Sequence, residues 1–296
     1  MNSVNVLHYD AFSSVPNKGN PIGIVLNADF LTEDEMQNIA FKVGFNETVF
    51  VLNSEKADLR LKYFTPGHEI NLCGHATIGS LYCLKSNGMF EDRNLIQIET
   101  NVGILPIKFD QMNDQLSIEM KQDRPQFTSF NGDIDKLAKS IGLVKEELDL
   151  DKPIVYGSTG TWTLLVPIKK LSSFNHMIPN NQQFPDVLAE NVRSSIHPIC
   201  FETYDNRALM HARHFSSPYS GTIEDPVTGT ASGVMGAYYL LYLNQNLNSV
   251  EFIVEQGQEI GRDGRVHVKA IRSEEDIDIF ISGTAIFVQE LKIEYV

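Results

Sequence analysis

Two stretches of the chain are apolar on every side, a pattern that surface helices do not have. No Asp, Glu, Lys or Arg occurs between Gly74 and Leu84, or from Pro226 through Val250. A helix without a polar face is normally enclosed by other structure. The second run is broken by glycines and tyrosines and is too short to cross a bilayer. Both stretches are therefore predicted to form helices buried inside the protein.

The same order of motifs leads into each predicted helix, and each series reads as strand, tight turn and helix start. The helix starts at Gly74 and Gly229 are 229 − 74 = 155 residues apart, which suits a chain of 296 residues made of two similar halves. The first series consists of Tyr63–Pro66, Gly67–Glu69 and Cys73–Thr77, and the second of His214–Pro218, Glu224–Pro226 and Thr228–Ala231.

Hydrophobic period and capping residues predict the remaining elements. Thr32 and Glu35 form a capping box, and Gly44 ends the helix that follows. The matching helix of the second half is expected over Pro185–Ile196, although it has no clear cap. Apolar alternation bounded by turn residues predicts strands over 4–12, 23–26, 48–52, 95–100, 104–109 and 115–120, and over 153–157, 162–167, 198–203, 251–255, 265–271 and 277–289.

This order of elements predicts an α+β fold of two similar domains. Each domain is expected to be a curved, mostly antiparallel, barrel-like sheet around its own buried helix. The halves would span residues 1–120 and 152–296. Residues 121–151 are richer in charge and are interpreted as a connector with a short amphipathic segment. We expect a cleft where the two helix starts meet.

Both helix starts have the chemistry of an anion site. A helix that begins with glycine and small residues leaves unpaired backbone N–H groups at its positive end. Such an end binds a carboxylate or another anion. Two of them favour one shared anionic ligand.

Composition narrows the class of protein. With 42% hydrophobic and 21% charged residues, the chain is long enough for two full cores. A formal net charge of −14 argues against binding to nucleic acid or to an anionic membrane. Any bound anion must therefore be held by local amides. Cys73, Cys83 and Cys200 form no metal-binding spacing, and no basic segment followed by an apolar one opens the chain, so a reducing cytoplasm is expected.

Six motifs follow one another along nearly the whole chain. They are Asp10-Ala11-Phe12, Gly19-Asn20-Pro21, Asn46-Glu47-Thr48-Val49-Phe50, Phe64-Thr65-Pro66, Cys73-Gly74-His75-Ala76-Thr77 and Glu224-Asp225-Pro226-Val227-Thr228-Gly229-Thr230-Ala231. In this order and combination, they resemble the phenazine-biosynthesis PhzF-like proteins, a branch of the diaminopimelate epimerase-like fold.

The resemblance implies a cofactor-independent isomerase that acts on a small carboxylate-bearing metabolite, and it implies a homodimer. One carboxylate, Glu47, would take a proton from carbon and return it elsewhere on the same substrate. A carboxylate can alternate between base and acid near neutral pH when a dry site raises its proton affinity. The helix amides would hold the enolate-like charge that forms. The implied site consists of Glu47, His75 and Asp225 as catalytic residues and of Asn20, Gly74, Gly229 and Thr230 as substrate-binding residues.

Simpler roles compete for some of these residues. His75 could cap its helix with the ring, and an acid at Asp225 is expected just before a helix for capping alone. Thr230 stands where members of the family more often carry serine. Threonine keeps the hydroxyl group but adds a methyl group to the pocket. Cys73 could be a small packed residue.

Other classes of function fit the sequence less well than an isomerase. A binding protein with the same anion site would need no ionisable carboxylate at Glu47. An epimerase or racemase is a nearer rival, but the second motif has no cysteine to pair with Cys73, so a two-thiol racemase is not expected. His68, Glu69, Cys73 and His75 do not have the spacing of a zinc site. No metal, nucleotide or flavin is expected.

Overall fold

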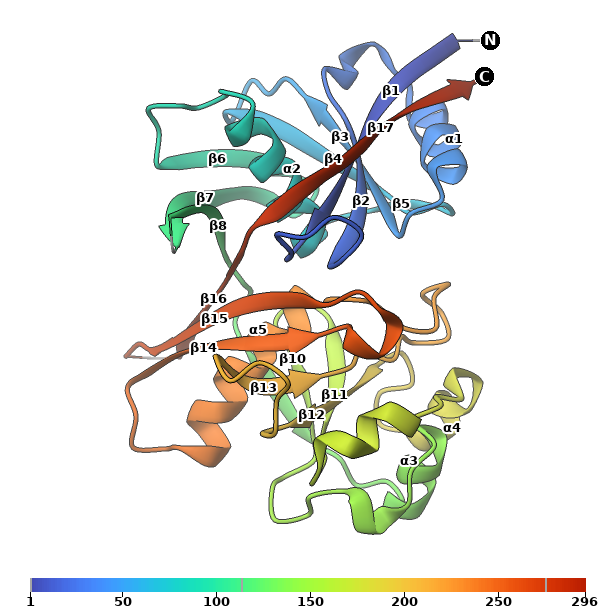
Figure 1. Ribbon diagram of the computed structural model, residues 1–296, viewed down its shortest axis with the longest axis vertical. Coiled ribbons are helices and arrows are strands. Elements are labelled where there is room, and N and C mark those ends of the chain that lie inside the picture. The colour runs from blue at the N-terminus through green and yellow to red at the C-terminus, as the bar shows by residue number, and fades with distance from the viewer. Residues whose placement is uncertain (1, 113, 275) are drawn as a thin grey trace. The chain divides into compact units, whose positions relative to one another are not determined.

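The computed structural model describes residues 2–112, 114–274 and 276–296 and has an α+β fold. The chain divides into two compact units, of which the first comprises Met1–Lys121 with Ser282–Val296 and the second Gln122–Ile281. Each unit has its own paired strands and its own buried helix, α2 in the first and α5 in the second (Figure 1).

The first unit is a mixed sheet with two helices. Its strand order is β17-β1-β2-β3-β4-β6-β7-β8, and every neighbouring pair is antiparallel except β2·β3 and β4·β6. Its elements are β1 (Asn2–Ala11), β2 (Asn20–Val25), η1 (Ala28–Phe30), α1 (Glu33–Val43), β3 (Glu47–Leu52), β4 (Leu59–Phe64), β5 (Glu69–Ile70), α2 (Gly74–Ser86), β6 (Leu95–Thr100), β7 (Gly103–Met112), β8 (Gln115–Lys121) and β17 (Ala285–Tyr295).

Helix α2 is the buried helix expected from its lack of charges. It contacts β1, β2, β3, β8 and β17, and its residues from His75 to Leu81 are all buried. The approach to β2 is close, because a Cβ at Gly79 would lie 2.4 Å from Cδ1 of Ile22. Helix α1 has the capping box that the sequence predicts at Thr32 and Glu35, and Gly44 ends it in the left-handed conformation.

The second unit repeats this pairing pattern. Its strand order is β9-β10-β11-β12-β13-β14-β15, antiparallel except for β11·β12 and β13·β14, so its two parallel pairs recur at the same places in the order. Its elements are β9 (Gln126–Ser129), α3 (Ile134–Ser140), η2 (Lys145–Glu147), β10 (Val155–Ser158), β11 (Trp162–Pro167), η3 (Leu171–His176), η4 (Asn181–Gln183), α4 (Phe184–Val187), β12 (Ser195–Cys200), β13 (Ala208–Ala212), α5 (Gly229–Tyr238), η5 (Tyr239–Leu243), β14 (Ser249–Gln256), η6 (Gln258–Ile260), β15 (Gly264–Arg272) and β16 (Ile277–Gly283).

Helix α5 is the second buried helix. It packs on β10, β14 and β15, and a Cβ at Gly236 would lie 2.7 Å from Cγ1 of Val268. The helix continues into one π turn, η5, before the chain enters β14. The absence of charged residues through this run therefore marks a helix that the sheet of its own unit covers.

Two elements differ from the sequence expectation. The helix expected over Pro185–Ile196 is wrong: α4 is a single turn, and the chain forms tight turns at Asn191 and Ser194 before β12 begins. The single strand expected over 277–289 is two strands, β16 and β17. Both errors arose where apolar residues without a cap or a break were read as one element.

The division of the chain also differs from the expected halves. Strand β17 pairs with β1 along its whole length, from Asn2↔Tyr295 to Ala11↔Ala285, so the last strand belongs to the first unit. The expected connector belongs to the second unit, where Leu137 and Ala138 of α3 are buried in its core. Among the described residues, no helix is both long and apolar enough to span a membrane.

Candidate active site

In the first unit, Glu47 and His75 lie against each other. Glu47 opens β3, and His75 is the second residue of α2; a distance of 3.0 Å separates Oε2 of Glu47 from Nε2 of His75. Only 15% of the Glu47 side chain and 8% of the His75 side chain are exposed. The pair is thus a carboxylate and an imidazole in a nearly dry setting, at the positive end of a buried helix.

Cys73 is the third member of this group. It occupies the N-cap position of α2, and its Sγ lies 3.3 Å from Nδ1 of His75. The ring of His75 therefore stands between a thiol and a carboxylate. The sequence interpretation of Cys73 as a small packed residue does not foresee this contact, because the spacing of two residues across a helix start does not fix where either side chain points.

Charge in this group follows from burial and from its neighbours. Burial raises the pKa of the Cys73 thiol, and the negative charge of Glu47 raises it further. Burial by itself lowers the pKa of His75, but negative charge at Cys73 and Glu47 raises it well above 6.5. Among these neighbours, Cys73 contributes most to the raised pKa of His75, and Glu47 contributes next.

The start of α2 is available to an anion. No side chain caps its first N–H groups among the described residues, and no acid lies in its first turn. Gly74, for which the family resemblance implies substrate binding, is the first residue of this helix and adds no side chain beside its first N–H groups.

Asn20 lies at the same end of the sheet as Glu47. It opens β2, and β2 runs parallel to β3 with Ile22 opposite Glu47. The loop before it is held by Asp10, whose carboxylate accepts a hydrogen bond from the backbone N–H of Asn17 and pairs with His8 at 3.1 Å. The turn needs Gly19, since its φ is 69° and a Cβ would lie 2.2 Å from the carbonyl oxygen of Ala11.

In the second unit, Asp225, Gly229 and Thr230 lie together at the start of α5. Gly229 is the first residue of the helix, which has no side-chain cap and no acid in its first turn among the described residues. The hydroxyl of Thr228 donates to Oδ2 of Asp225 at 2.5 Å, so the carboxylate is fixed beside the helix start. Thr230 is the second residue, and its carbonyl accepts a hydrogen bond from Thr159.

Gln256 holds the Asp225 turn in place, although no sequence motif marks this residue. Its side chain is fully buried at the end of β14. The amide nitrogen donates to the carbonyl of Asp225 at 2.8 Å, and the amide oxygen accepts from the N–H of Thr228 at 3.2 Å. No local motif marks such a residue, because its partners lie about thirty positions earlier in the chain.

A buried ion pair secures the same turn from the other side. Arg213 donates to both oxygens of Glu224, at 2.9 and 2.6 Å, and its remaining nitrogen donates to the carbonyls of Phe174 and Met177. Asp225 follows Glu224 directly and donates its own N–H to the carbonyl of His214. The position of the Asp225 carboxylate is therefore determined by a network of buried side chains.

The candidate metal ligands of the sequence do not gather as a group. His68 is exposed and contacts Thr65, while Glu69 accepts from Asn101. Cys73 and His75 are joined instead by Glu47, and the three donor atoms lie within 4.8 Å of one another.

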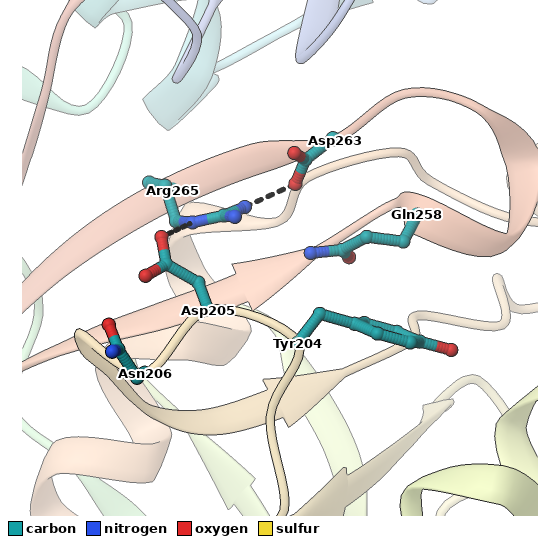
Figure 2. A pocket seen from close by; sticks show the side chains of 6 residues that line it. All are labelled: Tyr204, Asp205, Asn206, Gln258, Asp263 and Arg265. Atoms are coloured by element: carbon teal, nitrogen blue, oxygen red, sulfur yellow. Dashed lines mark hydrogen bonds and ion pairs between the residues drawn. The ribbon is translucent and has the colours of Figure 1, made fainter.

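A hollow of about 450 Å³ in the second unit contains none of the predicted site residues (Figure 2). Asp205 and Asp263 both bind the guanidinium of Arg265, and Asp205 also binds Arg207. Each carboxylate that lines this hollow is therefore already paired with an arginine. Its remaining lining residues are Tyr204, Asn206 and Gln258.

Comparison with known proteins identifies the family. The profile of the phenazine biosynthesis-like proteins (PhzC-PhzF) matches residues 9–291. The chain is 51% identical over 287 residues to YfhB of Bacillus subtilis, named an uncharacterized isomerase, with 97% of each chain covered. It is 27% identical over 285 residues to the trans-2,3-dihydro-3-hydroxyanthranilate isomerase of Pseudomonas chlororaphis, covering 94% of this chain and 96% of that one.

A solved structure agrees with the fold along the whole chain. The crystal structure of a phenazine biosynthesis protein of the PhzF family from Bacillus anthracis superposes with a TM-score of 0.98 at 56% identity. The match covers 99% of this chain and 100% of the other.

Proposed function

The chain belongs to the phenazine biosynthesis-like family and is an isomerase, and from this premise we propose that it moves a proton on a small carboxylate-bearing metabolite with Glu47 as the single acid/base and without a cofactor. The observation that carries this proposal is the contact of Glu47 with His75 at the uncapped start of α2. It joins a proton carrier to a site for negative charge.

The reaction would proceed in two proton transfers. Glu47 takes a proton from a carbon next to an unsaturated or carboxylate-bearing centre, and the electron pair of the C–H bond enters the conjugated system. The protonated Glu47 then returns the proton to another carbon of the same molecule, so that a double bond moves and nothing is oxidised or reduced. General acid/base transfer of this kind contributes about 10²- to 10⁴-fold.

Stabilisation of the delocalised anion would supply the larger share. The backbone N–H groups of Gly74 and His75 lie at the positive end of α2, and His75 adds a positive charge. Preorganised donors in a dry site stabilise charge that develops in the transition state. In the second unit, the start of α5 at Gly229 and Thr230 offers the same kind of donors.

The remaining site residues would orient the substrate. We assign Asn20, at the start of β2, and Asp225, at the start of α5, to polar groups of the substrate such as an amino or a hydroxyl group. Catalysis by Asp225 itself would require it to touch the reacting atoms, and its test is the Asp225→Asn variant. The proposal also includes a homodimer, which light scattering of the purified protein measures directly.

The arrangement supports an isomerase over an epimerase. An epimerase of this fold needs acid/base groups on opposite faces of one carbon, whereas Glu47, Cys73 and His75 form one cluster within 4.8 Å. A single cluster suits removal and return of the proton on one face. The relative from Pseudomonas chlororaphis, an isomerase of trans-2,3-dihydro-3-hydroxyanthranilate, makes cyclic unsaturated carboxylates the first substrate class to test.

The test is deuterium incorporation from heavy water, followed by mass spectrometry, with a panel of small unsaturated carboxylic acids that includes trans-2,3-dihydro-3-hydroxyanthranilate. The wild type should introduce label into one compound and move its double bond. Glu47→Gln should lose at least about 100-fold in rate. Glu69→Gln is the matched control, since Glu69 is a partly buried acid of the same unit that binds Lys62 and Asn101.

Three outcomes would contradict the proposal. If Glu47→Gln keeps its rate, another group carries the proton. Label that enters with inversion of one carbon and no shift of a double bond would establish the epimerase instead. A compound that binds wild type and Glu47→Gln equally, without exchange, would identify a binding protein.

A further inference from the structure

Three different metal-binding atoms converge at the start of α2. They are the thiol of Cys73, the imidazole of His75 and the carboxylate of Glu47, and all three lie within 4.8 Å of one another. Nε2 of His75 is 3.9 Å from Sγ of Cys73 and 3.0 Å from Oε2 of Glu47. Sulfur, imidazole nitrogen and carboxylate oxygen are the donors that zinc binds in proteins.

These separations approach those of a tetrahedral zinc site. Zinc bonds of about 2.3 Å to sulfur and about 2.0 to 2.1 Å to nitrogen and oxygen place a sulfur and a nitrogen ligand about 3.6 Å apart, and a nitrogen and an oxygen about 3.4 Å apart. Both observed distances differ from these values by less than about half an ångström, a difference that side-chain rotation removes.

A second observation points to an ion between these groups. Oε2 of Glu47 is buried, and its 3.0 Å contact with Nε2 of His75 is a charge contact that lacks the alignment of a hydrogen bond, so the hydrogen-bonding capacity of this oxygen is unsatisfied among the described residues. A buried carboxylate oxygen that accepts no hydrogen bond is costly even beside a positive charge. A cation placed between this oxygen, the imidazole and the thiol would satisfy all three groups.

We propose that Glu47, Cys73 and His75 form a three-donor site for Zn²⁺ and that zinc bound there inhibits the enzyme by occupying the carboxylate that carries the proton. The proposal has a binding half, that zinc binds at these three residues, and an inhibition half, that bound zinc stops the reaction. Only the inhibition half rests on the function proposed above. Zinc here is a ligand that competes with catalysis and is not a cofactor of the reaction. Three protein ligands leave a fourth position for water.

Binding exchanges protons for the metal and involves no redox step. The thiol and the imidazolium release their protons to solvent as Zn–S and Zn–N bonds form. Mg²⁺ prefers oxygen ligands in octahedral geometry and has no comparable set here, so it serves as the control cation.

Calorimetric titration of the reduced full-length protein with ZnCl₂ tests the binding half. We expect one zinc per chain with a Kd below about 10 µM, and no binding of Mg²⁺. Cys73→Ser should weaken zinc binding at least about 100-fold. Cys83→Ser and His68→Ala remove a thiol and an imidazole outside the cluster and should bind zinc as the wild type does.

A spectroscopic measurement on the wild type keeps the test decisive if Cys73→Ser does not fold. Co²⁺ in place of zinc should give a thiolate-to-metal charge-transfer band in the near ultraviolet. Absence of this band, absence of saturable zinc binding, or equal affinity of folded Cys73→Ser would each overturn the proposed site.

Isomerase assays test the inhibition half. Zinc should suppress turnover of the wild type at the concentration at which it binds, and a chelator should restore the rate. Each variant is compared with its own zinc-free rate, and Cys73→Ser should need at least about 100-fold more zinc. Full turnover with zinc bound would overturn inhibition, while a failure to find any substrate would count against the proposed function and leave the titration result standing.

Discussion

Replacing Gln256 by leucine should both destabilise the protein and impair its active site. The substitution keeps a buried side chain of similar size but removes the amide that joins Asp225 to Thr228. The carbonyl of Asp225 loses its donor, and the N–H of Thr228 loses its acceptor. The turn that presents the Asp225 carboxylate then keeps the Arg213–Glu224 pair, the hydroxyl of Thr228 and the bond from its own N–H to His214, but it loses both contacts to β14.

The size of the effect follows from these two lost partners. A buried polar group left without a hydrogen bond costs about 1–3 kcal/mol. Asp225 and Thr228 are only half-buried, so water replaces part of the loss and the lower end of that range applies to each. We therefore expect the free energy of unfolding to fall by about 2–3 kcal/mol, and kcat/KM to fall by about 10- to 100-fold as Asp225 shifts.

Urea unfolding followed by circular dichroism measures the first quantity, and isomerase kinetics the second. Gln258→Leu is the matched control, because the amide of Gln258 is buried but forms no hydrogen bond with the described residues. It should change stability by less than about 0.5 kcal/mol or increase it. If both variants unfold alike and Gln256→Leu retains full activity, Gln256 does not position the turn.

Three further predictions concern the helices and the charge at their ends. The pKa of His75 is raised above 6.5 in the folded protein, so its stabilising contribution is fully present below that pH and is lost as the pH rises through the folded pKa. In urea unfolding, the stability difference between wild type and His75→Gln should therefore be larger at pH 6 than at pH 9. A difference that does not change with pH would count against a charged His75. Gly236→Ala should lower the free energy of unfolding by about 1–3 kcal/mol, because the new Cβ would lie 2.7 Å from the stiff side chain of Val268. Gly233→Ala should lower it less, since its nearest contact is 3.1 Å. Thermal unfolding that ranks the two variants in the opposite order would contradict the packing argument. Thr32→Ala should cost about 1 kcal/mol in the same assay by removing the cap of α1, and Thr32→Ser should restore most of it.

Much of the fold could be predicted because its signals are local. The lack of charges from Gly74 to Leu84 requires burial whatever surrounds the helix, and the capping box at Thr32 determines where α1 begins. Strands such as β6 and β11 were predicted to the residue, since alternation and turns bound them on both sides.

The rest depended on contacts between distant parts of the chain. Residues 185–196 do not form one helix, because the chain turns at Asn191 and Ser194 and β12 pairs with β11. The spacing of apolar residues predicts neither the turns nor the pairing. The assignment of β17 to the first unit depends on its pairing with β1, about 280 residues away.

The site divides in the same way. Motifs located Glu47, His75 and the Asp225 turn along the chain, but the 3.0 Å contact between Glu47 and His75 arises from the packing of α2 on β3. The sequence motif includes Cys73 but does not predict that its thiol lies beside His75 and Glu47. Gln256 gave no signal, because a lone glutamine in a strand resembles any polar edge residue.

The pairing of β1 with β17 also has a consequence for synthesis on the ribosome. Strand β17 belongs to the first unit, so that unit cannot complete its sheet until β17 has been synthesised. The second unit is one continuous segment and can finish folding while the first still lacks a strand. The edge of β1 is exposed during that interval, and an unpaired strand edge is a site where nascent chains aggregate. Chains truncated before residue 285 should for this reason be recovered mainly as insoluble protein.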